Sequence, residues 1–464
     1  MANVGAQLSG PGTTDSELRR TISWRSSILL AIAAALQITV IMGPMANELG
    51  NLQPLIWAFA AAAGLVQCLF IAELATHFPC RSGGTATYAH EAFGDRNKWL
   101  PALSSWAYWF AWTPGIAVNL ILASKYIRAT IAPHVNTVVL SLIIGAGLYA
   151  VNARGLRLNV KITAGLIILT AVPVVVMLMA PVFRPSLFHG AQVWPFHVPA
   201  RHGSDVALVV KWLFVAAWSA YGAEMASTIF AECRISKSAA VRGMAVAGTA
   251  CLIGFSLVPF VMTGIVGASG LGGDPATVFL VPARVVMGGA GATITGLMLA
   301  GALIVGAQAY IISSSRTLCQ MSRDGYMPRM FQRVNRFGVP LNTVLCDAVV
   351  IALLAGIFGT NVVNVVAAAN TGYLLVFIIL PLGFLAVRRR RAQAGEPLVM
   401  AGWLAPVAVV FAAVNAVLLV AGSALWGPGI WLTGAVVLIA VFPLMLVRAL
   451  EERRARSVAG AGTP

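Results

Sequence analysis

Long apolar segments alternate with short polar connections along almost the whole chain. Roughly 20 consecutive apolar residues suffice to cross the hydrocarbon core of a bilayer. On that basis we predict twelve membrane spans, joined by short loops except at 183–204 and 323–341. The spans are 24–48, 53–78, 99–127, 135–151, 160–182, 206–231, 241–267, 290–321, 342–358, 362–387, 402–425 and 429–447. The pattern indicates an all-α, multi-pass membrane protein embedded in a lipid bilayer.

Composition and charge agree with this prediction. Of the 464 residues 59% are hydrophobic and 10% are charged, whereas soluble domains average about a quarter charged residues. The net charge is +16, and Lys and Arg near span ends set the orientation of membrane proteins. All but six of the 31 Lys and Arg lie on the side of the N-terminus, so we expect both termini in the cytoplasm, a cell (plasma or inner) membrane location and no nucleic acid partner. The six predicted outside are Lys125, Arg128, Arg184, Arg201, Lys211 and Arg284.

The first ten spans divide into two sets of five. Because five is odd, the second set must be inverted relative to the first. The predicted organisation is a disordered cytoplasmic N-terminus (1–20), a first repeat (21–182), an extracellular loop (183–205), a second, inverted repeat (206–387), two further spans (388–450) and a cytoplasmic tail (451–464).

The first and sixth spans both carry residues that weaken a helix. Span 1 reads "LQITVIMGPMANELG" and contains Gln37, Thr39 and the pair Gly43-Pro44, while span 6 contains "WSAYGAEMAS" at 218–227. Matched interruptions in two halves point to the substrate site of an inverted-repeat transporter. Unwound backbone is tolerated at that depth only where protein, water or ligand satisfies it. The alternative is that Gly and Pro only kink packed helices.

Ionisable residues inside spans are functional candidates, because each costs roughly 2.5–3.5 kcal/mol on insertion scales. Glu224 directly follows the interruption of span 6, so we expect it to bind a proton or gate the substrate; a neutral, hydrogen-bonded glutamic acid is the alternative. We expect Glu73 to bond loop backbone at the inner interface and Asp347 to pair with a loop arginine. Lys161, taken alone, reads as a lysine that snorkels to the surface.

Other chemistries find little support. The six cysteines form no CxxC motif and read as packing residues, which gives no disulfide framework and no metal site. We find no HExxH motif and no Gly-x-Ser-x-Gly turn in a credible context. The chain is therefore not expected to be an enzyme or to hold a cofactor, and its oligomeric state is open.

Four stretches resemble the amino acid–polyamine–organocation (APC) superfamily of transporters. They are "AELATHFPCRSGGTATYAHEAFG" (72–94), "VNARGLRLNVK" (151–161), "WSAYGAEMAS" (218–227) and "SRTLCQMSRDGYMPRMFQRVNRFGVP" (315–340). They occur in the family's order and spacing over about 270 residues. The resemblance implies the LeuT-like, five-plus-five inverted-repeat fold with two additional helices, and a permease for an amino acid or related small amine. Proton-coupled symport is the expected mode; an exchanger (antiporter) of amino acids or polyamines and a non-transporting sensor on the same scaffold are alternatives.

The resemblance also implies roles for individual residues. Trp218 matches an aromatic gate, the backbone of Ala220, Tyr221 and Gly222 would receive the substrate amine, and Tyr108 and Tyr310 would wall the pocket. Lys161 stands where sodium-coupled relatives bind a cation, so its ammonium could take part in proton coupling. The family usually has a glycine-rich turn in span 1, where bare N–H groups bind a carboxylate. This chain has Leu36, Gln37, Ile38 and Thr39 there, so the ligand is either an amino acid or an amine without an α-carboxylate.

Overall fold

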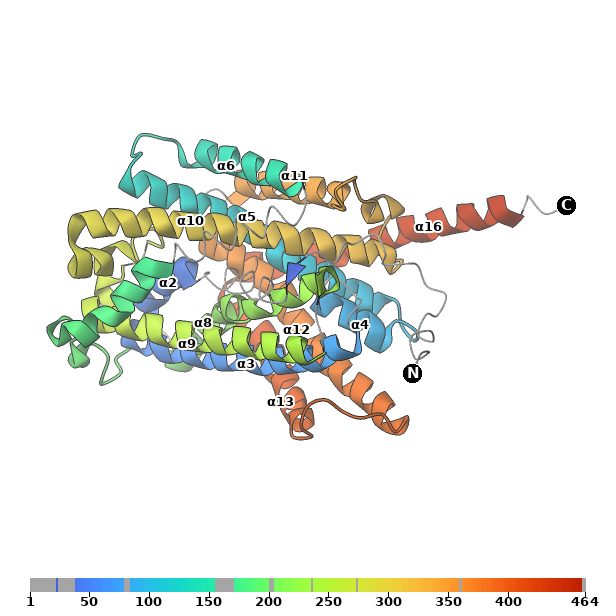
Figure 1. Ribbon diagram of the computed structural model, residues 1–464, viewed down its shortest axis with the longest axis horizontal. Helices are drawn as coiled ribbons and strands as arrows, with labels where there is room; N and C mark the ends of the chain where they lie inside the picture. Colours follow the sequence, from blue (N-terminus) through green and yellow to red (C-terminus); the bar gives the residue numbers. More distant parts are fainter. Residues whose placement is uncertain are drawn as a thin grey trace, which may run out of the picture.

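The structure is a computed structural model that describes residues 22–23, 38–78, 84–154, 171–199, 204–234, 237–272, 274–358 and 361–460. Its helices run largely along one direction and form an elongated bundle (Figure 1). Within the described residues, seven helices are long and apolar enough to cross a membrane, or eight if Ala171–Phe183 and Pro185–Gln192 form one bent span. The chain is thus an all-helical membrane protein. The number twelve and the inverted repeat stay predictions.

The helices follow the apolar segments of the sequence. The first half contains α2 (Ile38–Leu49), α3 (Gln53–His77), α4 (Thr85–Phe93), α5 (Trp99–Thr130), α6 (Thr137–Asn152) and the helix Ala171–Phe183. The second half contains α8 (Asp205–Ala220), the 3₁₀ segment η5 (Gly222–Glu232), α9 (Lys237–Gly270), α10 (Leu280–Arg323), α11 (Leu341–Phe358) and α12 (Val362–Gln393). The chain closes with α13 (Leu404–Val417), the π-helical η7 (Leu418–Gly422), α14 (Ser423–Leu425), α15 (Pro428–Ile439) and α16 (Val441–Gly460).

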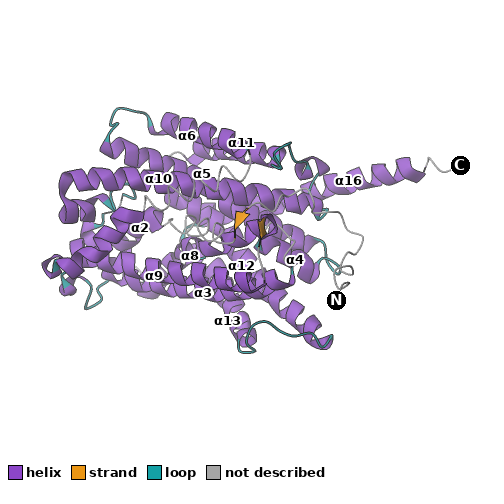
Figure 2. Cartoon of the chain, viewed as in Figure 1, coloured by secondary structure: helices purple, strands orange, loops and turns teal. Residues whose placement is uncertain are grey.

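Apart from the α-helices, the described chain contains little regular structure (Figure 2). The short 3₁₀ segments η2 (Gly50–Leu52), η3 (Pro185–Leu187), η4 (Gly190–Gln192) and η6 (Arg329–Gln332) lie in connections. Two two-residue strands, β1 (Ile22–Ser23) and β2 (Cys233–Arg234), pair in parallel. This pairing places Ile22 and Ser23, which precede the first predicted span, beside the residues that follow η5.

Burial separates central from peripheral helices. In α12, 83% of the most apolar 18-residue stretch is buried inside the protein. In the helical segment Pro428–Ser457 only 17% of the corresponding stretch is buried. Helix α5 packs against α10 and α12 and is buried over most of its length. Its hydropathy falls below that of a typical span because it carries Trp, Tyr, Ser and Thr. A helix enclosed by other helices does not need a lipid-compatible surface, which explains the polar and aromatic content of α5.

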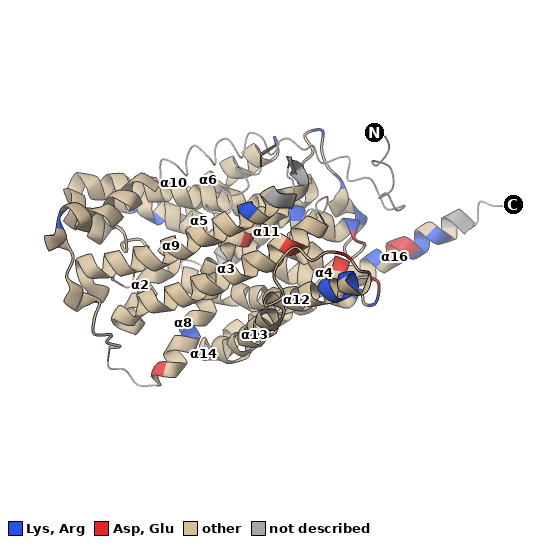
Figure 3. Ribbon diagram, turned by 60° about the horizontal axis from the view of Figure 1, so that its bottom comes forward, with Lys and Arg blue, Asp and Glu red and all other residues tan. Residues whose placement is uncertain are grey.

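Most Lys and Arg of the described residues gather at one end of the bundle, from which α16 projects (Figure 3). At this end Glu73 Oε2 accepts hydrogen bonds from Arg388 Nη1 at 3.1 Å and from the Met400 backbone N–H at 3.2 Å. Arg388 also donates to the carbonyls of Met400 and Ala401. The prediction that Glu73 bonds loop backbone is therefore confirmed, and the pair fixes the connection between α12 and α13.

The expected interruption of the first span is absent at Gly43-Pro44. Helix α2 runs without interruption from Ile38 to Leu49, with Pro44 inside it, and a proline removes a single helix hydrogen bond. The expected turn at Leu36–Thr39 begins outside the described residues and stays a prediction. A Cβ on Gly43 would lie 2.8 Å from the Gly272 carbonyl oxygen, so this glycine permits a close approach of two backbones. Residues 24–37, including Gln37, lie outside the described residues.

Candidate functional site

The sixth predicted span is interrupted where the sequence indicates. Helix α8 ends at Ala220, and the chain continues from Gly222 as the 3₁₀ segment η5. A 3₁₀ stretch within a longer helix leaves carbonyl groups free from the regular ladder. The Tyr221 carbonyl accepts a long bond of 3.3 Å from the Glu224 backbone N–H and a short one of 2.6 Å from Gln67 Nε2 on α3. The break is thus held by a side chain from a neighbouring helix.

Close packing of α3 supports this arrangement. A Cβ on Gly64 would lie 2.4 Å from the Ala220 carbonyl oxygen, so only glycine lets α3 approach the end of α8 this closely. Gln67 follows three residues later on the same helical face. Together the two residues position α3 against the last carbonyl groups of α8.

Glu224 lies at the centre of a buried polar contact. Its carboxylate accepts hydrogen bonds from Tyr108 Oη, at 2.8 Å to each oxygen, and from Tyr373 Oη at 3.1 Å. The carboxylate is 0% exposed, and none of the ion pairs formed by the described residues involves it. A buried carboxylate without a cation is costly when ionised. The geometry therefore suits a group that binds a proton or faces a positively charged solute.

Aromatic rings surround this carboxylate. We call them the aromatic cluster, and Trp112 is its hub, because its ring lies 4.7 to 6.3 Å from each of the other four. The members are Tyr108 and Trp112 of α5, Trp218 of α8, Tyr310 of α10 and Tyr373 of α12, all 0% exposed. Four helices therefore contribute rings to the cluster, and both the rings and the carboxylate are closed off from the surface.

Two glycines set the spacing within the cluster. A Cβ on Gly115 would lie 2.9 Å from both the Trp218 and the Tyr310 rings. Gly84, the last residue of the sequence "SGG" (82–84), has a φ of +66°, which favours glycine. A Cβ there would lie 3.3 Å from Tyr108 Oη and 2.7 Å from Thr228 Cγ2 of η5. The loop before α4 thus reaches the same site.

The predicted site residues fall into three groups. Tyr108, Trp218, Tyr221, Glu224 and Tyr310 are brought together around the break, with the backbone of Ala220 and Gly222 at its two ends. Ile38 and Thr39 are buried on α2, which packs against α8. Gln37 and Lys161 lie outside the described residues.

Three contributors were missed from the sequence: Trp112, Tyr373 and Gln67. Trp112 lies one helical turn after Tyr108, which spacing alone could have signalled. Tyr373 follows Asn370 in an otherwise apolar span, and buried polar residues in membrane helices are functional candidates. Asp347 was expected to pair with a loop arginine, and this is wrong for the described residues: its partners are Trp109, Thr113 and Ser314.

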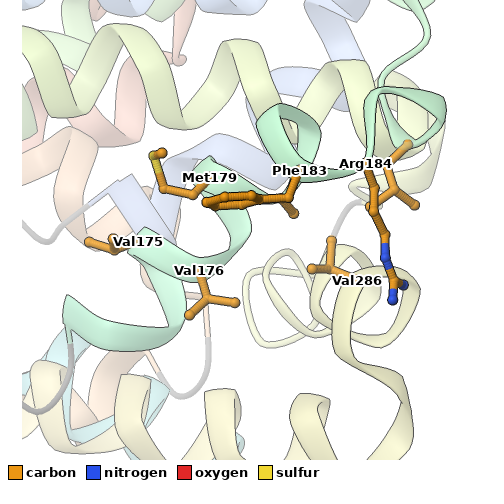
Figure 4. Close-up of a pocket in the computed structure, with 8 residues that line it drawn as sticks. Val175, Val176, Met179, Phe183, Arg184 and Val286 are labelled. Atoms are coloured by element: carbon orange, nitrogen blue, oxygen red, sulfur yellow. The ribbon is translucent and has the colours of Figure 1, made fainter.

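A separate cavity lies away from this cluster. It has a volume of about 330 Å³ between the helix Ala171–Phe183 and α10, and its lining is mostly apolar with Arg184 at one side (Figure 4). None of the predicted site residues lines it. Its outer residues Val175 and Phe183 are exposed, so the cavity opens on the surface that would face lipid.

Comparison with known proteins identifies the chain. The sequence model of the amino acid permease family matches residues 22–442. The chain belongs to this family. The uncharacterized amino acid permease YvbW of Bacillus subtilis is 21% identical, covering 83% of this chain and 87% of its own length. The tryptophan permease of Saccharomyces cerevisiae is 23% identical over 90% of this chain and 73% of its own length. An uncharacterized transporter of Mycobacterium tuberculosis is 24% identical over 98% and 97%.

Solved structures share the fold at lower identity. A manganese transporter of Eremococcus coleocola aligns with a TM-score of 0.57 and 14% identity, covering 98% of this chain and 99% of that chain. The nucleobase-cation-symport-1 family transporter Mhp1, in a closed conformation with bromovinylhydantoin bound, aligns with a TM-score of 0.56 and 20% identity over 96% of each chain. This permease is therefore a secondary transporter, rather than an enzyme, and acts on a small molecule.

Proposed function

We propose that this permease carries an amino acid or a related small amine across the cytoplasmic membrane and couples that movement to protons. The observation that carries the proposal is the position of Glu224, two residues after the break and inside the aromatic cluster. The Tyr221 carbonyl at the end of α8 bears partial negative charge, which favours a cation. An ammonium group placed there would lie between the Tyr221 carbonyl, the Glu224 carboxyl group and aromatic faces, all of which attract cations.

Glu224 would supply the coupling. A proton that binds this carboxylate from the acidic side neutralises it, since an unpaired buried carboxylate is disfavoured when ionised. Release of that proton on the opposite side, together with the solute, would couple the two movements in the same direction. The expected fold, with twelve spans arranged as two inverted repeats and both termini cytoplasmic, would place this coupling at the middle of the membrane. Lys161 is expected to take part in proton coupling through its ammonium group, as a cationic group in addition to the solute.

The test uses purified protein in proteoliposomes. A thermal-shift screen of amino acids, polyamines and amino alcohols identifies the solute, because a ligand stabilises the folded state by mass action. We expect uptake of that solute to be driven by an acidic exterior, and Glu224→Gln to abolish this dependence. Glu48→Gln is the matched control, because Glu48 is a partly exposed glutamate that pairs with Lys211 at 2.7 Å, away from the cluster.

The outcomes separate the alternatives. Uptake that needs the same solute inside the vesicle, with no response to a pH gradient, would indicate an exchanger. Specific binding without any flux would indicate a sensor. If Glu224→Gln responds to the pH gradient as the unmodified protein does, Glu224 is not the coupling group.

A further inference from the structure

A second buried carboxylate lies outside the aromatic cluster. Asp347 of α11 is 0% exposed. Its Oδ1 accepts from Trp109 Nε1 at 2.7 Å and, at 3.5 Å, from Thr113 Oγ1; its Oδ2 accepts from Ser314 Oγ at 2.5 Å. No Lys, Arg or His within the described residues forms an ion pair with it. An ionisable residue inside a membrane span is a functional candidate by default.

The groups around Asp347 do not provide a compensating charge. Helix α11 packs against α5, α6, α10 and η6. The titratable side chains Tyr149 of α6 and Cys346 of α11 supply no positive charge. On α10 the nearest basic side chain in sequence is Arg316, which donates to Ser315. On η6 the side chain of Arg329 is exposed. Proton uptake is therefore the simplest way to neutralise the buried carboxylate.

Ser314 can serve both forms of the carboxylate. Its hydroxyl donates to Asp347 Oδ2, and the Ile311 carbonyl oxygen lies 3.4 Å away as an alternative acceptor. If a proton resides on Oδ2, the carboxyl O–H can donate to Ser314 Oγ while the serine donates to Ile311. A hydroxyl both donates and accepts, so a proton can come and go without moving any heavy atom far.

Helix α5 donates to both carboxylates through adjacent residues, and α10 bonds η5 and Asp347 through adjacent residues. On α5 Tyr108 donates to Glu224, and the next residue, Trp109, donates to Asp347. On α10 Ser313 bonds Thr228 of η5 at 3.0 Å, and the next residue, Ser314, bonds Asp347. Successive residues on a helix point about 100° apart. The two carboxylates therefore lie on different sides of the packed α5–α10 pair. A movement of these two helices would affect the bonds at both carboxylates.

From this geometry we propose that Asp347 is a second proton-binding site of the permease, separate from Glu224. A change of charge at Asp347 alters the bonds that tie α11 to α5 and α10. Because α5 and α10 also carry Tyr108 and Ser313, the change reaches the wall of the solute site and η5. The proposal does not depend on which solute is carried, and it goes beyond the proposed role of Glu224.

Infrared difference spectroscopy of the purified full-length protein tests it without measuring transport. As the pH is raised, a protonated carboxylic acid loses its carbonyl band. We expect Asp347→Asn to remove one component of that band and Glu224→Gln to remove another, each leaving the other in place. Asp205→Asn is the control, because Asp205 is exposed at the start of α8 and should contribute no buried acid band.

A second variant covers the case in which Asp347→Asn does not fold. Ser314→Ala keeps the carboxylate but removes its hydroxyl partner, so the frequency of the Asp347 component should shift. A spectrum of Asp347→Asn identical to that of the unmodified protein at every pH overturns the proposal, and so does an unshifted band in Ser314→Ala. Loss of the Glu224 component alone would leave the proposed coupling group standing while rejecting the second site.

Discussion

The hydrogen bond between Gln67 and the Tyr221 carbonyl allows a direct test of where the substrate amine binds. If an ammonium group binds this carbonyl, it must compete with Gln67 Nε2, which lies 2.6 Å from the same oxygen. The Gln67→Leu substitution removes the competitor and keeps a similar volume. A neutral hydrogen bond contributes about 0.5–1.5 kcal/mol net. Its removal should therefore tighten solute binding by about 2- to 13-fold.

Two opposing terms decide the effect on stability. The variant loses one hydrogen bond, but it also removes Gln67 Oε1, a buried acceptor without a partner among the described residues. Leaving such an atom buried costs about 1–3 kcal/mol, which offsets the lost bond. We therefore expect the free energy of unfolding of the ligand-free protein to fall by no more than about 0.5 kcal/mol, or to rise by up to about 2.5 kcal/mol.

Gln53→Leu is the matched control on the same helix. Gln53 is buried, donates to Thr263 Oγ1 at 3.1 Å, and also has an Oε1 without a partner among the described residues. Its loss should have a similar effect on stability and none on affinity. The assays are solute titration by thermal shift and the KM of uptake in proteoliposomes. An unchanged KM in Gln67→Leu would show that the Tyr221 carbonyl does not receive the amine.

Two further substitutions test the packing around the site and at the charged end of the bundle. Gly115→Ala places a Cβ 2.9 Å from the rings of Trp218 and Tyr310. Such overpacking costs about 1–3 kcal/mol and should slow uptake. Gly147→Ala is the control: its Cβ meets no atom within 4 Å, so uptake should be unchanged. Arg388→Ala removes the arginine partner of the buried Glu73 carboxylate, which keeps the Met400 N–H and has His77 Nε2 at 3.9 Å. Removing one member of a buried ion pair costs about 3–5 kcal/mol, so the thermal midpoint should fall sharply. An unaltered midpoint would contradict the importance of this ion pair.

Sequence reasoning located the features that rest on local chemistry. A glycine followed two residues later by a glutamate inside an apolar run is unfavourable for a plain membrane helix, so the break at Gly222 could be predicted. Likewise Glu73 could be assigned to the loop interface from its place near the end of a span. Gly43-Pro44 gave the wrong expectation because the sequence does not show that another backbone, at Gly272, packs against Gly43.

Partners that lie far apart in the chain could not be predicted in the same way. Tyr373 meets Glu224 across 149 residues, and Trp109 meets Asp347 across 238. The mean hydropathy of α5 is lower than that of a typical span, although α5 is the helix that donates to both carboxylates. Its low hydropathy and its central place have one cause, since a helix shielded from lipid by its neighbours is free to carry polar groups. A weakly apolar span between strongly apolar ones can therefore mark the helix that lines a transport site.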